Sequence, residues 1–137
     1  MVKMGINFDK TENLNNNIYY NYDIVTKIMY KVHYGLISAQ HITDSWQWAF
    51  TNNIIPQNTK RYLLDYRQAE FINPVRISSE IVRFYHANLM YFKDCKFAIV
   101  SDKSKNIATS LTVKKSDYSY QSEPFSFIEL AIEWLIT

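Results

Sequence analysis

The sequence predicts an α/β protein built on one mixed, mostly parallel β-sheet. Short runs rich in Tyr, Ile and Val alternate along the chain with segments whose apolar residues recur at helical spacing. Strands that alternate with helices are typical of right-handed crossovers between parallel strands. The first two predicted strands are separated by only a few residues, so they predict an opening hairpin with one antiparallel strand. About four helices complete the pattern.

Residues 1–17 are polar and rich in asparagine. They offer little apolar area to offset the entropy lost on ordering, so we expect a disordered tail. Residues 18–137 are enough for a single domain with its own core. The sequence therefore predicts one domain that follows a polar tail.

Residues 18–24 and 28–37 predict the two strands of the hairpin, because both runs are rich in Tyr, Ile and Val. The second run alternates between two sets of side chains, a packed set (Ile28, Tyr30, Val32, Tyr34 and Leu36) and a set expected to lie on a wetter face (Met29, Lys31, His33 and Gly35).

A first amphipathic helix is predicted from Ser38, a favourable N-cap residue, to the segment before Pro56. Trp46 falls on the apolar stripe of this helix and is expected in the core. Trp48 lies two residues further on, about 200° round the helix. It is therefore the best candidate for an exposed aromatic side chain with a binding role.

Residues 60–66 and Lys96–Val100 are short apolar runs, typical of strands in the interior of a covered sheet. The first run ends near Asp65, which is followed by Arg67. Asn73 then predicts the cap of a second helix, with Pro74 at its first position.

Three weaker elements follow. Residues 101–116 predict a helix anchored by Ile107 and Leu111, and residues 118–122 predict a short strand. Ser126 and Glu129 have the spacing of a capping box, which predicts the start of a last helix. Its expected core-facing stripe consists of Leu130, Ala131, Trp134 and Leu135.

Four pieces of sequence, in this order, resemble bacterial SpoIIAA-like domains, the fold of the STAS (sulphate transporter and anti-sigma-factor antagonist) domains. They are "IMYKVHYGLISAQHI", "YLLDYRQAEF", "KFAIVSDK" and "PFSFIELAIEWL". The resemblance spans about Ile18 to Leu135 and is greatest to stand-alone STAS-like proteins. It implies a regulatory or protein-binding function in the cytoplasm.

In anti-sigma antagonists, an Asp-Ser pair followed by Gly carries a regulatory phosphate at a helix start. The corresponding stretch here is Asn73-Pro74-Val75-Arg76, which has neither a hydroxyl nor a glycine. Ser78 and Ser79 lie about a turn further along the helix. The resemblance therefore implies that the usual phosphoacceptor serine is missing.

Composition excludes several classes of function. With only 2 glycines, the chain contains no Gly-rich phosphate loop. The net charge is +2 and the basic residues are scattered, which argues against nucleic-acid binding. No apolar run is long enough for a membrane span or a signal peptide. The single cysteine, Cys95, cannot form an internal disulfide, which favours a reducing cytoplasm.

The residues also lack a convergent catalytic or metal-binding set. Asp65 has no second acid or base assigned to it by the sequence, so we expect no enzymatic activity. The spacing of His33, His41 and His86 is not that of a zinc site, and we expect no metal and no cofactor. Cys95 has no histidine placed beside it and is expected to be a structural thiol.

The leading hypothesis is a non-enzymatic, cytoplasmic regulatory module that binds a protein partner through a surface near the second helix start. The candidate residues of that surface are Asp65, Arg67, Asn73, Arg76 and Trp48. One alternative is a carrier of a small apolar ligand, which needs a pocket of roughly 300 Å³ or more. Another is an enzyme centred on Asp65. The chain is expected to be a monomer or a weak homodimer.

Overall fold

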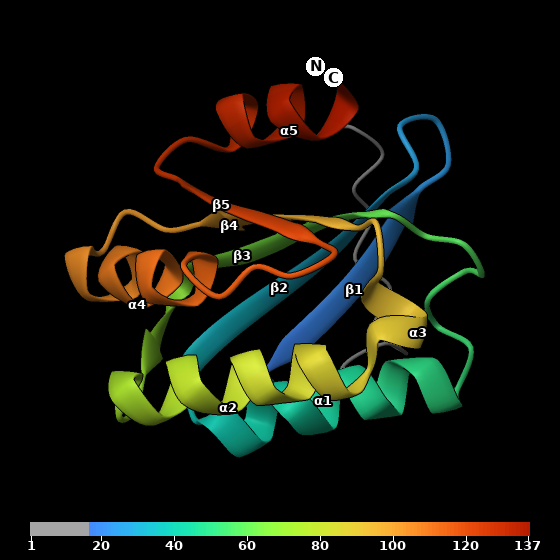
Figure 1. Cartoon of the computed structure of the whole chain (residues 1–137). Coiled ribbons are helices and arrows are strands. Elements are labelled where there is room, and N and C mark those ends of the chain that lie inside the picture. The colour runs from blue at the N-terminus through green and yellow to red at the C-terminus, as the bar shows by residue number, and fades with distance from the viewer. Residues whose placement is uncertain (1–16) are drawn as a thin grey trace.

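The computed structural model describes residues 17–137, which form one five-stranded sheet with helices on both faces (Figure 1). The strands are β1 (Ile18–Asp23), β2 (Ile28–Ile37), β3 (Arg61–Phe71), β4 (Lys96–Val100) and β5 (Gln121–Phe125). The helices are α1 (Ala39–Thr51), α2 (Pro74–Ala87), α3 (Leu89–Phe92), α4 (Ser104–Lys114) and α5 (Ile128–Ile136). Residues 1–16 of the expected tail lie outside the described residues.

The spatial order of the strands is the same as their order in the chain, β1-β2-β3-β4-β5. β1 is antiparallel to β2, and each later pair is parallel. This is the mixed, mostly parallel sheet with an opening hairpin that the sequence predicts. The described part has five helices and not about four, because the one-turn α3 follows α2 directly.

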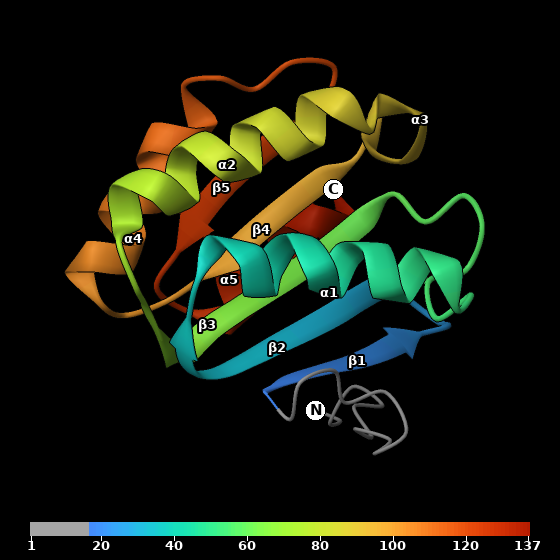
Figure 2. The same ribbon diagram turned by 90° about the horizontal axis from the view of Figure 1, so that it is seen from below.

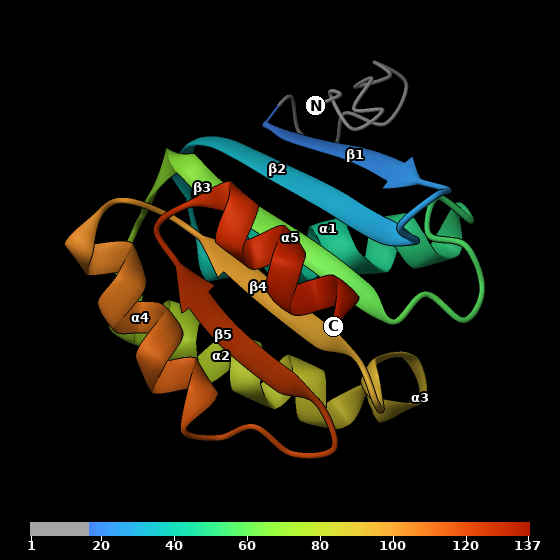
Figure 3. The same ribbon diagram turned by 90° about the horizontal axis from the view of Figure 1, so that it is seen from above.

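The helices divide between the two faces of the sheet. α1, α2 and α4 lie on one face and enclose the larger core, while α5 lies alone on the other face (Figures 1 and 2). Seen from the α5 side, α5 lies over the middle of the sheet, and β1 is the outermost strand (Figure 3). No helix of the described residues is long and apolar enough to cross a membrane.

Aromatic rings fill the larger core. Trp46 is fully buried, and its ring contacts Tyr62 and Phe92 with centroids 5.2 and 5.1 Å away. Ser38 caps α1 as predicted, with its Oγ accepting a hydrogen bond from the His41 backbone N–H.

The prediction that one face of β2 is wetter is wrong. Met29, Lys31 and His33 all point into the larger core, and the exposed fraction of both Lys31 and His33 is 0%. The alternation of the strand was predicted, but α1 covers the face with the polar side chains. Periodicity alone marks two faces and does not tell which one receives a helix.

β3 runs five residues beyond its predicted end at Tyr66. Val32 pairs with Asp65 and Tyr34 pairs with Gln68, so two residues of β3 lie opposite the single residue His33. This β-bulge changes the phase of the strand. Leu64 and Tyr66 face the larger core before it, and Ala69 and Phe71 face the same core after it.

Two predictions for residues 101–122 need correction. The final strand, β5, begins at Gln121, three residues after the predicted start at Tyr118. α4 exposes the predicted anchor Leu111 and instead buries a mostly polar face, which consists of Asn106, Thr109, Ser110 and Val113. These polar side chains form hydrogen bonds, so a helix with few apolar residues can still dock.

The predicted capping box of the last helix is also wrong. The residue at the N-cap of α5 is Phe127, and no side chain caps the helix. Leu130 is half exposed and Trp134 is partly buried, while Ala131 and Leu135 form the contact with the sheet. The contact face of α5 is therefore narrower than the predicted stripe.

Candidate functional site

Asp65 and Arg67 form an ion pair on the α5 face of the sheet. Asp65 lies in the middle of β3, next to Val100 at the end of β4, and not at the end of its own strand. Arg67 donates from Nε and Nη2 to the two carboxylate oxygens, at 3.0 and 2.7 Å. Its backbone N–H also donates to the Asp65 carboxylate at 3.0 Å. The hydrogen bond with Asp65 raises the pKa of Arg67.

These contacts use most of the hydrogen-bonding capacity of the Asp65 carboxylate. The side chain of Asp65 is 9% exposed, whereas that of Arg67 is 39% exposed. A bidentate arginine occupies both oxygens of a carboxylate and leaves little room for a metal ion. Among the described residues, no group of three or more His, Cys, Asp and Glu is arranged to hold a metal ion.

The bulge in β3 is held by two side chains from α4 and the loop before it. Asn106 Nδ2 donates to the carbonyls of Tyr66 and Ala69, at 3.4 and 3.2 Å. Lys103 Nζ donates to the carbonyl of Arg67. β4 has already ended here, so these groups replace the hydrogen bonds that a neighbouring strand would make.

The start of α2 presents a capped turn with exposed apolar side chains around it. Asn73 has a left-handed backbone (φ 56°), and its side chain accepts a hydrogen bond from the Arg76 N–H at 3.3 Å. Ile72 donates its N–H to the Ile37 carbonyl, which brings this turn beside the end of β2. Leu36, Ile72 and Val75 are 60, 45 and 79% exposed. We call Leu36, Ile72, Val75 and Arg76 the α2 rim.

The five residues predicted for a binding surface do not form one cluster. Asp65 and Arg67 lie on the α5 face, and Asn73 and Arg76 lie at the start of α2. Trp48 is in the last turn of α1, partly buried, with its ring 5.8 Å from that of Tyr20 in β1. Trp48 is therefore less exposed than the sequence predicts.

A buried pair of basic side chains is the feature that the sequence did not reveal. Lys31 Nζ lies 3.2 Å from His33 Nε2, and no carboxylate of the described residues pairs with either group. His33 Nδ1 lies 3.3 Å from the Asp65 carbonyl, and the imidazole stacks on Tyr66 with centroids 4.1 Å apart. A carbonyl only accepts, so Nδ1 carries the proton and Nε2 accepts from Lys31.

Burial lowers the pKa of Lys31 well below its ordinary value. It also lowers the pKa of His33, with a further contribution from the neighbouring Lys31. Lys31 Nζ lies 4.5 Å from the centre of the Trp46 ring, a geometry that would favour a charged amine. A cation–π contact is worth about 2 kcal/mol when desolvated. Removing an unpaired ammonium from water costs more than this, so burial favours the neutral form of both side chains.

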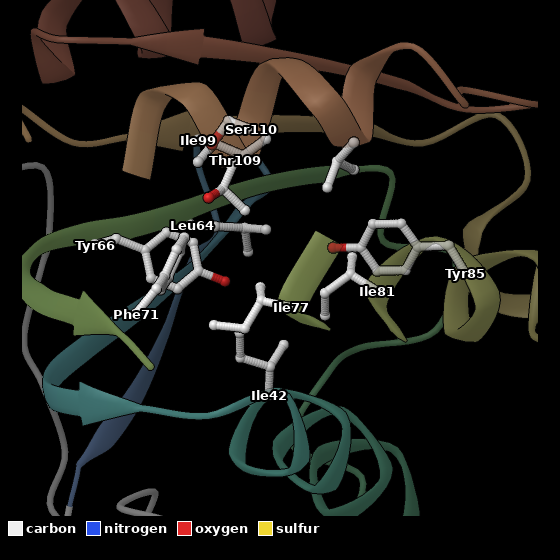
Figure 4. A pocket seen from close by; sticks show the side chains of 11 residues that line it. Ile42, Leu64, Tyr66, Phe71, Ile77, Ile81, Tyr85, Ile99, Thr109 and Ser110 are labelled. Carbon is white, nitrogen blue, oxygen red and sulfur yellow. The ribbon is translucent and has the colours of Figure 1, made fainter. Parts of the chain in front are cut away.

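A small cavity lies between the sheet and helices α1, α2 and α4 (Figure 4). The hydroxyls of Tyr66 and Tyr85 point into it, among side chains such as Ile42, Ile77 and Ile81 (Figure 4). Its volume is about 30 Å³. One water needs about 10–15 Å³, so this cavity has room for a few waters. It has no room for the apolar ligand of the carrier hypothesis.

A larger hollow of about 550 Å³ lies between the loop after α1 and α3. Phe50 and Tyr91 stack at one side of it, with ring centroids 3.9 Å apart. Most of its lining is polar, including Asn53, Gln57 and Asn58. An apolar ligand would therefore not be enclosed by apolar side chains there.

Comparison with known proteins identifies the fold. No family model matches the chain, and no curated protein matches it. Among solved structures, the chain is similar to an uncharacterised protein of the DUF3478 family with a SpoIIAA-like fold, from Shewanella loihica PV-4. The TM-score is 0.59 at 11% identity, and the match covers 86% of this chain and 91% of the other. The predicted SpoIIAA-like fold is confirmed.

Proposed function

We propose that this protein is a regulatory module that binds a protein partner through the α2 rim and works without catalysis. The observation that carries the proposal is the exposure of Leu36, Ile72 and Val75 beside Arg76. Leu36 lies in β2, Ile72 in the turn between β3 and α2, and Val75 in the first turn of α2, and the hydrogen bond from Ile72 to Ile37 brings these segments beside one another. Exposed apolar groups gathered in this way are typical of interaction sites, whereas single exposed apolar residues need no explanation.

The turn that carries the α2 rim is fixed before any partner binds. The Asn73 cap, the restricted backbone of Pro74 and the hydrogen bond from Ile72 to Ile37 each limit its motion. A fixed surface loses little entropy on binding. Arg76 lies 3.6 Å from Glu80, a long and exposed ion pair that a stronger acidic partner can replace. We therefore expect a partner with an apolar side chain flanked by a carboxylate.

The absence of catalysis is proposed from the state of Asp65. Its carboxylate accepts three hydrogen bonds from Arg67, so it is not free to act as a base. Ser78 is buried, and its hydroxyl donates to the Val75 carbonyl. It is therefore not presented to a kinase in the folded protein.

Site-specific photo-crosslinking in the source cells tests the proposed surface. A photoreactive residue at position 75 should give one dominant protein adduct. The same residue at position 90 is the control, because Met90 is 80% exposed but lies on α3, beyond the far end of α2. The 14 residues of α2 separate the two positions by about 20 Å.

A charge change gives the second arm of the test. Leu36→Glu should reduce the adduct at position 75 at least tenfold, because it places a carboxylate where an apolar contact is expected. Met90→Glu should leave it unchanged. Two results would show that the α2 rim is not the binding surface. One is an equal yield of adduct at positions 75 and 90. The other is an adduct at position 75 that Leu36→Glu does not reduce although the protein stays folded.

A further inference from the structure

The two edges of the sheet differ in how their outward backbone groups are satisfied. At the β5 edge, the N–H of Ser122 donates to Asp117 Oδ2 at 2.7 Å, and its carbonyl accepts from Lys114 Nζ at 3.2 Å. Pro124 follows, and proline has no N–H. Side chains and proline therefore block this edge against another strand.

The β1 edge has no such protection among the described residues. The Tyr34 N–H donates to the Asn17 carbonyl, and this hydrogen bond shows which residues of β1 have their backbone groups directed towards β2. Because antiparallel pairs alternate, the N–H and carbonyl groups of Ile18, Tyr20 and Tyr22 point away from β2. No described side chain or strand covers these groups, and β1 is the outermost strand in Figures 2 and 3.

The side chains along this edge favour pairing with another strand. From Ile18 to Tyr22 the strand carries no charge and no proline, two of the features by which edge strands resist pairing. Tyr22 and Trp48 are partly buried at the border of the larger core. A strand added beside β1 would cover the exposed parts of both rings and would complete the burial of Trp48.

We propose that the β1 edge binds a second copy of this chain, in antiparallel register about a twofold axis at Tyr20. In this register Tyr20 pairs with Tyr20 of the second copy, and Ile18 pairs with its Tyr22. All the outward N–H and carbonyl groups of these three residues are then satisfied. Asp23 lies opposite Asn17, so no like charges meet.

The choice of a second copy follows from this self-complementarity. A twofold axis requires one surface to match itself, and an uncharged strand whose outward groups alternate regularly does so. The pairing extends the sheet to ten strands with β5 closing both ends. Six residues of strand give less area than a standard interface, so the dimer is weak and depends on concentration.

Sedimentation of the full chain over a range of concentrations tests for the dimer, together with amide hydrogen exchange at Tyr20 and Tyr22. We expect a monomer–dimer equilibrium, with protection of both amides rising as the dimer forms. A chain that stays monomeric at millimolar concentration would overturn the proposal. So would protection of both amides that is independent of concentration, because another part of the same chain would then cover the edge.

Tyr22→Pro is the discriminating variant. It removes an outward N–H, for which the described residues offer no acceptor, and puts a ring in the path of the second strand. It should raise the dimer dissociation constant at least tenfold, while Tyr22→Ala, which keeps the N–H, should change it much less. If the dimer forms equally well in Tyr22→Pro, the edge is not its interface.

The register has its own test. Position 19 faces position 21 of the second copy, at the separation of a non-hydrogen-bonded pair, where a disulfide can form. Mixing Tyr19→Cys with Asn21→Cys should therefore give a covalent heterodimer under mild oxidation. Each variant alone should not. Equal crosslinking in the single variants would contradict the antiparallel register centred on Tyr20.

Discussion

Lys31 is a basic side chain in the centre of an aromatic core, with an imidazole as its polar neighbour. A neutral amine in this position is costly, because the unfolded chain binds a proton that the folded chain does not. Replacing it by an apolar side chain of similar length should therefore stabilise the protein.

Lys31→Met should raise the free energy of unfolding by at least about 1 kcal/mol at pH 7. The gain should shrink between pH 7 and pH 9. The folded-state pKa of Lys31 is lowered, so wild-type stability rises as the pH approaches the unfolded pKa near 10.5. Urea unfolding of both proteins at the two pH values measures this. A Lys31→Met protein less stable than wild type would show that the amine has a stabilising partner.

His33 should make the fold sensitive to mild acid. Its folded-state pKa is lowered, so its stabilising contribution is complete above the unfolded pKa of about 6.5 and is lost as the pH falls below it. One such group changes the free energy of unfolding by about 1.4 kcal/mol per pH unit. The groups that face it are Lys31, Tyr66 and the Asp65 carbonyl, and none of them offers a counter-charge.

The variant His33→Phe should remove that dependence between pH 6 and pH 5. The pH dependence of the free energy of unfolding is compared between wild type and variant, because the absolute stability also changes when the hydrogen bond to Asp65 is lost. Denaturant unfolding at half-unit steps of pH gives the slopes. If wild type and His33→Phe lose stability in parallel over this range, the imidazole is charged in the folded protein.

Among the helices, α4 shows best what the sequence could and could not predict. The capped starts of α1 and α2 were predicted, because Ser38 and Asn73 act through neighbouring residues in the chain. The buried face of α4 was not, because Asn106 acts on β3, 37 to 40 residues away in sequence. Local sequence patterns cannot predict contacts between residues so far apart in the chain.

The same difference between local and long-range contacts decides which parts of the candidate site the sequence could predict. The sequence placed Asp65 and Arg67 near each other, since they are two residues apart, and the structure shows them paired. The alternation of β2 predicts a wetter face for Lys31 and His33, but α1 packs on that face and buries both side chains. The position of α1 cannot be predicted from the pattern of β2 alone. The sequence singled out Asn73 and Arg76 at the start of α2, but Leu36 comes beside them only through the end of β2, far away in the chain.

Asn106→Ala should cost about 1–3 kcal/mol, because it leaves buried carbonyls of β3 without their donor. Leu111→Ala, on the exposed side of the same helix, should change stability by less than about 0.5 kcal/mol. Thermal unfolding of both variants measures the contrast. Equal costs would mean that α4 docks through the apolar residues that its sequence pattern suggests.

For the molecule as a whole, the sheet couples two cores. β3 supplies Leu64 and Tyr66 to the larger core and Leu63 to the smaller one beneath α5. Neither core can lose its sheet face while the other stays folded. We therefore expect a single cooperative unfolding transition for the described domain.

Two single-tryptophan proteins measure this cooperativity. One keeps Trp46 in the larger core and the other keeps Trp134 beside Phe125 in the smaller core, with phenylalanine at the remaining positions. Each urea midpoint from tryptophan fluorescence should coincide with the midpoint from far-UV circular dichroism of the same protein. Earlier loss of the Trp134 signal in its own protein would show that α5 detaches as a separate unit.

The bulge in β3 has a consequence for how the gene can change. Because it reverses the phase of the strand, removing a single codon between Asp65 and Gln68 would turn Ala69 and Phe71 towards water and bring Glu70 into the core. Length variation among descendants of this gene should therefore be rare in this strand and should accumulate in the loop between α1 and β3. In a library of single-codon deletions, the bulge should be among the least tolerant positions outside the buried helices.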